Sequence, residues 1–100
     1  MNEAEKFAVE AQLRETSRRL SQVSEFYGAL DLDGQVRDEM REAMEGYSVA
    51  TQRIMDLLVN AITLGREPSV KDDAEIQRNH RMRLAAMARL VGIAPHPSTH

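Results

Sequence analysis

The middle third of the chain decides the fold: residues 36–64 read VRDEMREAMEGYSVATQRIMDLLVNAITL. Apolar residues recur in this stretch at alternating steps of four and three. They are Val36, Met40, Ala43, Tyr47, Ala50, Ile54, Leu57, Ala61 and Leu64, which we call the seam. This spacing places all of them on one face of an α-helix, as in a coiled coil. We therefore predict a helix over residues 34–64, about 45 Å long at 1.5 Å per residue.

A second apolar row widens the seam and predicts more than one neighbouring helix. It consists of Met44, Met55, Leu58 and Ile62. The methionines Met40, Met44 and Met55 have two interpretations, because flexible thioethers serve adaptable binding surfaces and also fill irregular cores. Gly46 lies off the seam and is either a tolerated or a close-packed glycine.

Shorter amphipathic segments flank this helix, over residues 3–27 and 70–91. The first carries the apolar row Val9, Leu13, Leu20, Val23 and Tyr27, with Thr16 in the one remaining place; the second carries Ile76, Leu84, Met87, Leu90 and Val91. Gly28, Gly65 and Gly92 are predicted to end the three helices in the left-handed conformation. The sequence thus predicts an all-α fold of two to three long antiparallel helices, an elongated bundle in a single domain over residues 1–100. Residues 95–100 are expected to form a flexible tail.

The connector before the middle helix contains two candidate N-caps, Asp31 and Asp33. The same carboxylates, with Glu42, occupy positions 1, 3 and 12 of a calcium loop. Position 6 of that loop would be Val36 where the loop requires glycine, so we prefer the capping interpretation. Ser69, followed by Asp72 three positions later, predicts the start of the third helix.

The composition argues against catalysis and against a membrane. The chain has no Cys, and its three histidines do not show the i, i+4 spacing of a zinc site. We find no nucleophile with a base in a motif and no glycine-rich phosphate loop. No apolar run approaches the roughly 20 residues of a membrane span, and the N-terminus does not read as a secretory signal. We expect a cytoplasmic, non-enzymatic protein without metal or cofactor.

The length of the middle helix indicates a partner. A domain of 100 residues has an expected radius of gyration of about 13 Å, so a 45 Å helix leaves part of its seam uncovered. A second copy of the chain would cover it most simply, and we expect a homodimer.

Charge is distributed unevenly along the chain. Residues 31–64 hold seven acidic and three basic side chains, whereas the segment from Arg78 to Arg89 contains no acid. We predict that Arg78, His80, Arg81, Arg83 and Arg89 form one electropositive helix face. Such a face would match the acidic middle helix, bind an acidic partner protein, or contact DNA phosphates.

The end of the third helix resembles a known family. The run 84–95, LAAMARLVGIAP, is similar to the C-terminal signature of the TraM antiactivators, and residues 43–57 are similar to their middle helix. The resemblance implies a helical dimer that binds the LuxR-type quorum-sensing activator TraR, largely through its DNA-binding domain, and keeps conjugal transfer genes silent. It also places the activator contacts on the third helix, at Arg78, Arg81, Leu84, Met87, Val91, Ile93 and Pro95.

Two other functions remain open from the sequence. The basic residues near Arg81 are compatible with a small DNA-binding or nucleoid-associated protein, although the net charge of −3 makes direct nucleic-acid binding the weaker expectation. A structural helical adaptor that only self-associates is the other alternative.

Overall fold

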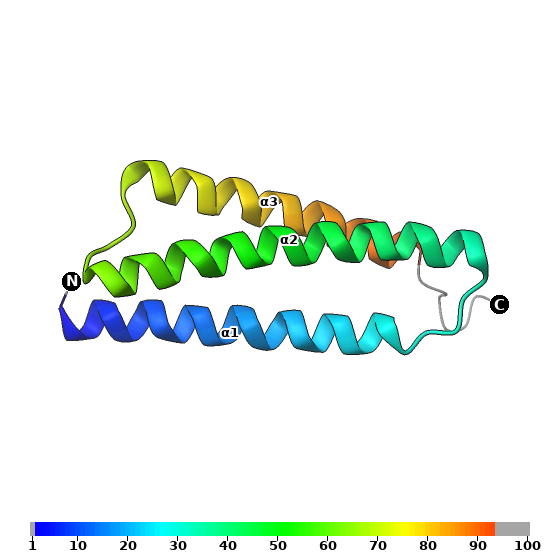
Figure 1. Ribbon diagram of the computed structural model, residues 1–100, viewed down its shortest axis with the longest axis horizontal. Helices are drawn as coiled ribbons and strands as arrows, with labels where there is room; N and C mark the ends of the chain where they lie inside the picture. The colour runs from blue at the N-terminus through cyan, green and yellow to red at the C-terminus, as the bar shows by residue number, and fades with distance from the viewer. Residues whose placement is uncertain (1, 94–100) are drawn as a thin grey trace.

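The computed structural model describes residues 2–93, which form three α-helices: α1 (Glu3–Gly28), α2 (Gly34–Leu64) and α3 (Val70–Ile93). The described part contains no β-strand (Figure 1). This confirms the predicted all-α class and the antiparallel helices. The bounds of α2 coincide with those that its apolar period indicated. The expected tail, residues 95–100, lies outside the described residues.

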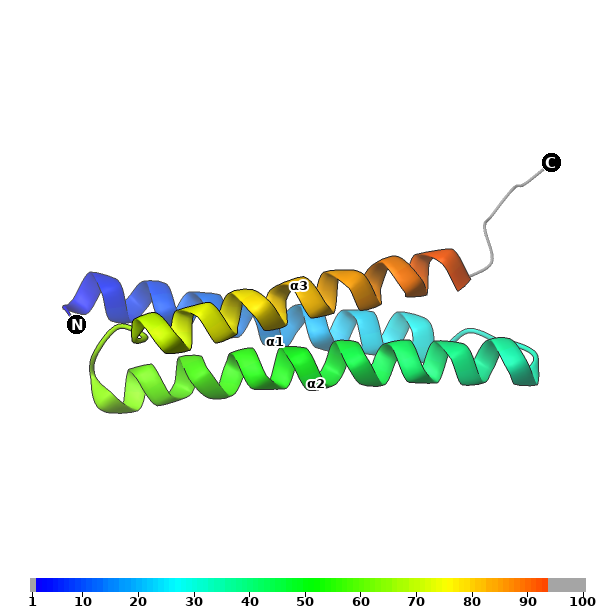
Figure 2. The same ribbon diagram turned by 90° about the horizontal axis from the view of Figure 1, so that it is seen from above.

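Helix α2 lies between the other two helices. Both α1 and α3 pack along its length, whereas α1 and α3 make no close backbone contact with each other in the described part (Figures 1 and 2). The molecule measures 53 × 21 × 21 Å and has a radius of gyration of 16.1 Å. This exceeds the roughly 13 Å of an average domain of this length, so the bundle is elongated as predicted.

Polar side chains cap the beginning of each helix. The Asp33 carboxylate accepts a hydrogen bond from the Val36 N–H at 3.1 Å, and the Ser69 hydroxyl accepts one from the Asp72 N–H at 3.1 Å. Asp33 rather than Asp31 is therefore the N-cap of α2. These bonds satisfy backbone donors that have no partner in the first turn of a helix.

The first helix has a capping box that the sequence analysis did not identify. Asn2 accepts a hydrogen bond from the Glu5 N–H at 2.8 Å, while the Glu5 side chain accepts one from the Asn2 N–H. A capping residue three positions before Glu is the signal that could have found it.

Of the three glycines predicted to end a helix in the left-handed conformation, two do not have that conformation. Gly65 does have the left-handed conformation, with φ of 65°. Gly28, in contrast, is the last residue of α1, and Ala29 continues in the right-handed region with its N–H donating to the carbonyls of Glu25 and Phe26. Gly92 lies inside α3, because the helix continues to Ile93, which packs on the core.

Most of the seam is buried. Seven of its nine residues, from Met40 to Ala61, are buried, Val36 is half-buried, and Leu64 is exposed. The prediction for Leu64 is therefore wrong. A strict seven-residue repeat drifts by about 20° per heptad around a straight helix. Over four heptads, the last seam position is therefore rotated well away from the first.

The core consists of two apolar clusters. The first lies where α1 begins and comprises Ile54, Leu57, Leu58 and Ile76, covered by Val9 and Leu13. The second lies where α1 ends and comprises Met40, Ala43 and Leu90, covered by side chains that include Val23, Tyr27, Met44, Met87 and Ile93. Met40 and Met44 thus belong to the core, in agreement with the core-filling interpretation of these methionines.

Between the clusters, each helix contributes one buried polar residue. Thr16, Thr51 and Asn79 are at most 7% exposed, and we call them the polar layer. Along its own helix, each of them lies between residues of the first cluster and residues of the second. The hydrophobic core is therefore interrupted near its middle.

Candidate functional site

The side chains predicted to contact a partner are only partly accessible on α3. Arg78 and Arg81 are exposed, and Leu84 and Val91 remain 54% and 51% exposed. Leu84 and Val91 are seven residues apart, so they lie on the same face of the helix. This face therefore has an apolar surface that α1 and α2 do not cover.

Two of the other predicted contact residues are not exposed on the surface. Met87 and Ile93 are half-buried and pack against the second apolar cluster. Pro95 lies outside the described residues.

The predicted electropositive face on α3 is wrong. Arg78 approaches Glu75 at 3.8 Å, and Arg89 approaches Glu42 of α2 at 3.9 Å. His80 and Arg83 instead line a cleft on the side of α3 that faces α1. Residues along an α-helix advance by about 100° each, so Arg78, Arg81 and Arg89 share one side of α3, whereas His80 and Arg83 lie on another.

A pair of opposite charges links α2 to α3. Arg53 Nε donates to Glu75 Oε1 at 2.6 Å, and the Glu75 side chain is 20% exposed. This hydrogen bond lowers the pKa of Glu75 and raises the pKa of Arg53. The acid here stands on α3 and the base on α2. Arg89 and Glu42 have the reverse arrangement, a base on α3 beside an acid on α2, which the charge distribution suggested.

A cleft of about 280 Å³ lies between α1 and α3 at the level of the polar layer. Its lining residues come from all three helices: Gln12, Glu15, Thr16, Arg19, Ile54, Ile76, Gln77, His80 and Arg83. The two isoleucines are buried and belong to the first apolar cluster, whereas the remaining residues are polar. The cleft lies where α1 and α3 both pack on α2 without close backbone contact with each other in the described part.

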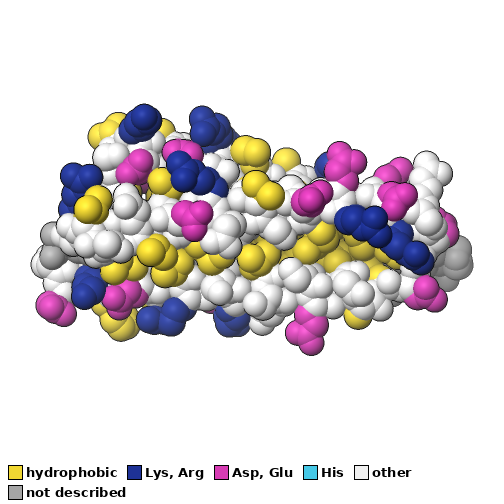
Figure 3. Space-filling view, in the orientation of Figure 1, with side chains coloured by type: hydrophobic (Ala, Val, Ile, Leu, Met, Phe, Trp, Pro, Cys, Tyr) yellow, Lys and Arg dark blue, Asp and Glu magenta, His cyan; other side chains and the backbone are white. Residues whose placement is uncertain are grey.

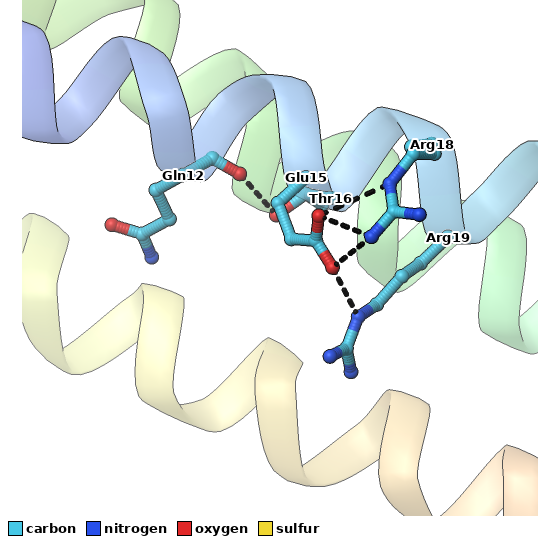
Figure 4. Close-up of polar contacts among 5 residues, drawn as sticks. All are labelled: Gln12, Glu15, Thr16, Arg18 and Arg19. Atoms are coloured by element: carbon cyan, nitrogen blue, oxygen red, sulfur yellow. Dashed lines mark hydrogen bonds and ion pairs between the residues drawn. The ribbon is translucent and has the colours of Figure 1, made fainter.

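The α1 side of this cleft contains a compact ionic group (Figure 4). The Glu15 carboxylate accepts hydrogen bonds from Arg18 Nη2 at 2.6 Å and from Arg19 Nε at 2.9 Å. The bonds from Arg18 and then Arg19 lower the pKa of Glu15. Beside it, the Thr16 hydroxyl donates to the Gln12 carbonyl oxygen at 2.8 Å. The charge of Glu15 is thus balanced within α1.

The α3 side of the cleft is not balanced in this way. Arg83 Nε donates to His80 Nδ1 at 3.2 Å, which leaves the hydrogen of the neutral imidazole on Nε2. Arg83 Nη1 is buried and has no hydrogen-bond partner within residues 2–93. The same is true of the Thr51 hydroxyl oxygen in the polar layer.

A second hollow, of about 370 Å³, lies between the end of α1, the connector and the beginning of α2. Leu30, Leu32, Met40 and Met44 give it an apolar lining, and Arg37 stands among its polar residues. Arg37 Nη2 donates to the Leu32 carbonyl oxygen at 2.7 Å. Figure 3 shows apolar side chains recessed between α1 and α2, with basic side chains beside them at the end of the bundle where these two helices are connected.

Comparisons with family models, curated proteins and solved structures gave no match to this chain. Within residues 2–93, none of the helices has both the length and the apolar character that crossing a bilayer requires. The same residues contain no cluster of three or more His, Asp or Glu side chains placed to hold a metal ion.

Proposed function

We propose that the protein is an antiactivator: it binds a LuxR-type quorum-sensing transcription factor, blocks its binding to DNA and so represses conjugal transfer genes. The observation that carries this proposal is the uncovered apolar face of α3 at Leu84 and Val91, with exposed Arg81 nearby. The resemblance to the TraM antiactivators lies on this same segment.

The mechanism needs no chemical reaction. A helix face of this kind binds by burying its apolar side chains in a groove or against a helix of the partner. If the bound form of the activator cannot contact DNA, each binding event shifts the activator away from its promoter. The protein acts in the cytoplasm, where such a partner is found.

We further propose that the acting form is a homodimer. Phe7, Phe26 and Val49 are each more than 60% exposed on the single chain, and the bundle is elongated. A second copy would bury part of this surface. Sedimentation of the purified protein at several concentrations tests this, and a monomer at all of them contradicts it.

A promoter-shift assay tests the function itself. The activator alone is expected to retard promoter DNA, and a stoichiometric excess of this protein should abolish that shift. In a separate experiment, the protein should co-purify with the activator. The variant Leu84→Asp should leave the shift in place, because it introduces a charge into the binding face. Val59→Asp is the matched control, since Val59 is 47% exposed on α2 and belongs to neither proposed interface.

Two results would contradict the proposal. One is an unchanged shift at excess protein. The other is direct, salt-dependent binding of this protein to DNA that Arg81→Ala weakens, which would favour the DNA-binding alternative. Self-association without either activity would favour the structural adaptor.

A further inference from the structure

Arg83 has a buried guanidinium nitrogen without a hydrogen-bond partner in the described part of the bundle. Its Nε is used by His80, but its Nη1 has no partner within residues 2–93 although solvent does not reach it. A buried donor on a charged group is costly to leave unpaired, more so than a neutral one. The Arg83 side chain lines the α1–α3 cleft, so a group entering the cleft can reach it.

The charge of the cleft favours an anion. Among the residues that line it, Arg19 and Arg83 are basic and Glu15 is the one acid. Two basic residues against one acidic residue give the lining a net formal charge of +1, which matches a monoanion. The Glu15 carboxylate disfavours a dianion.

The volume of the cleft and the residues that line it restrict the kind of ligand further. A volume of about 280 Å³ is at the lower limit of small-molecule sites. Ile54 and Ile76 are buried apolar residues in its lining, whereas Gln12 and Gln77 contribute amides from opposite sides. A ligand of matching chemistry has one negatively charged oxygen group and a short aliphatic part.

We propose that this cleft binds a small aliphatic monocarboxylate. The carboxylate pairs with the guanidinium of Arg83, the His80 Nε2–H is a second available donor, and the aliphatic part contacts Ile54 and Ile76. The cleft adjoins the face of α3 at Leu84 and Val91, because His80 stands four residues before Leu84. The proposal does not rest on the antiactivator function, since butyrate binding is measured on this chain alone.

Binding has a structural consequence. The two walls of the cleft, α1 and α3, make no close backbone contact with each other in the described part. A ligand that contacts both walls would bind the folded bundle and not the unfolded chain, and so would raise its melting temperature.

Butyrate is the probe, with butyramide as its uncharged counterpart and inorganic phosphate as a dianion, all at constant ionic strength. We expect butyrate to raise the melting temperature of the full chain saturably, and the other two to have no comparable effect. In wild-type protein, butyrate should also shift the NMR signals of the His80 ring and of the Gln12 and Gln77 side-chain amides. The NMR arm requires no variant, so it remains decisive if a substitution impairs folding.

The variant Arg83→Gln keeps hydrogen-bond donors but removes the charge, and it should weaken butyrate binding at least about tenfold. Arg81→Gln, on an exposed part of α3 outside the cleft, should bind butyrate as the wild type does. Equal effects of butyrate and butyramide, equal binding of phosphate, or no NMR change at the cleft would overturn the proposal. So would an Arg83→Gln variant that binds butyrate normally but has lost the activator, since the partner of Arg83 would then be an acidic side chain of that protein.

Discussion

The two apolar clusters and the polar layer between them follow opposite physical rules. In the clusters, Leu58 and Leu90 are almost fully buried among aliphatic neighbours, so burial itself stabilises them. In the polar layer, Thr16 and Asn79 are buried only because each donates a hydrogen bond to the carbonyl oxygen four residues earlier in its own helix. Thr51 makes no such bond within the described residues.

This difference assigns separate tasks to the two regions. The clusters supply the free energy that holds α1 and α3 on α2. The polar layer contributes little to that, because the hydrogen bonds of Thr16 and Asn79 stay within their own helices. The cleft between α1 and α3 opens at this level.

The largest effect should come from a charge placed in a cluster. Ile54 is 3% exposed, and Ile54→Asp would bury an unpaired carboxylate, at a cost of at least about 3 kcal/mol. Since an average domain is stable by only about 5–15 kcal/mol, we expect loss of the cooperative thermal transition measured by circular dichroism. Val59→Asp on the exposed side of α2 is the control, and a variant at Ile54 that melts like the wild type would mean that the seam is not the core.

A cavity in the second cluster should have the next largest effect. Leu90 is fully buried against Met40 and Ala43, so Leu90→Ala removes apolar contacts and leaves a void. We expect urea denaturation to show a loss of about 3 kcal/mol in the free energy of unfolding. The neighbouring Val91→Ala, at a half-exposed position, should cost no more than about 0.5 kcal/mol. Equal losses at both positions would contradict the orientation of α3.

The sequence predicts the clusters well because a repeated spacing is a direct consequence of helix geometry. Nine residues at steps of four and three define one face of α2, whatever packs against it. The same reasoning placed Thr16 in the row of α1 although it is polar, and the structure buries it. It failed at Leu64, because a seven-residue repeat drifts around a straight helix.

The cleft could not be predicted, because it depends on how three helices are placed in space. His80 and Arg83 stand three residues apart in the sequence. Grouping them with Arg78 and Arg89 suggested that all of these side chains share one face of the helix. Only the packing of α1 on α2 shows that two of them turn toward Gln12 and Thr16. Likewise, the hydrogen bond from Arg53 to Glu75 joins residues 22 positions apart, a distance at which helical periodicity carries no information.

A substitution in the polar layer should stabilise the protein, whereas those at Ile54 and Leu90 should destabilise it. Thr51→Val keeps the shape of the side chain and removes a buried hydroxyl without a partner, so we expect a gain of about 1 kcal/mol in urea denaturation. Thr16→Val is the matched control: its hydroxyl already donates to the Gln12 carbonyl, so no penalty is relieved and the gain should be absent. If Thr51→Val destabilises the protein instead, the Thr51 hydroxyl has a hydrogen-bond partner in solution. The comparison of the polar layer with the apolar clusters would then understate how well the layer is hydrogen-bonded.

The smallest effect should come from the pair that links α2 to α3 beside the first cluster. The pKa of Glu75 is lowered from its ordinary value of 4.5 by the hydrogen bond from Arg53, so the unfolded chain binds more protons than the folded one as the pH falls. The stabilisation by this pair is therefore fully present above about pH 4.5 and is lost as the pH falls through the lowered pKa. The unfolding free energies of wild type and Glu75→Gln should accordingly differ slightly at neutral pH and converge in acid, and the difference should vanish in an Arg53→Gln background. A difference that persists unchanged in acid would mean that Glu75 acts through packing on α2, and not through its charge.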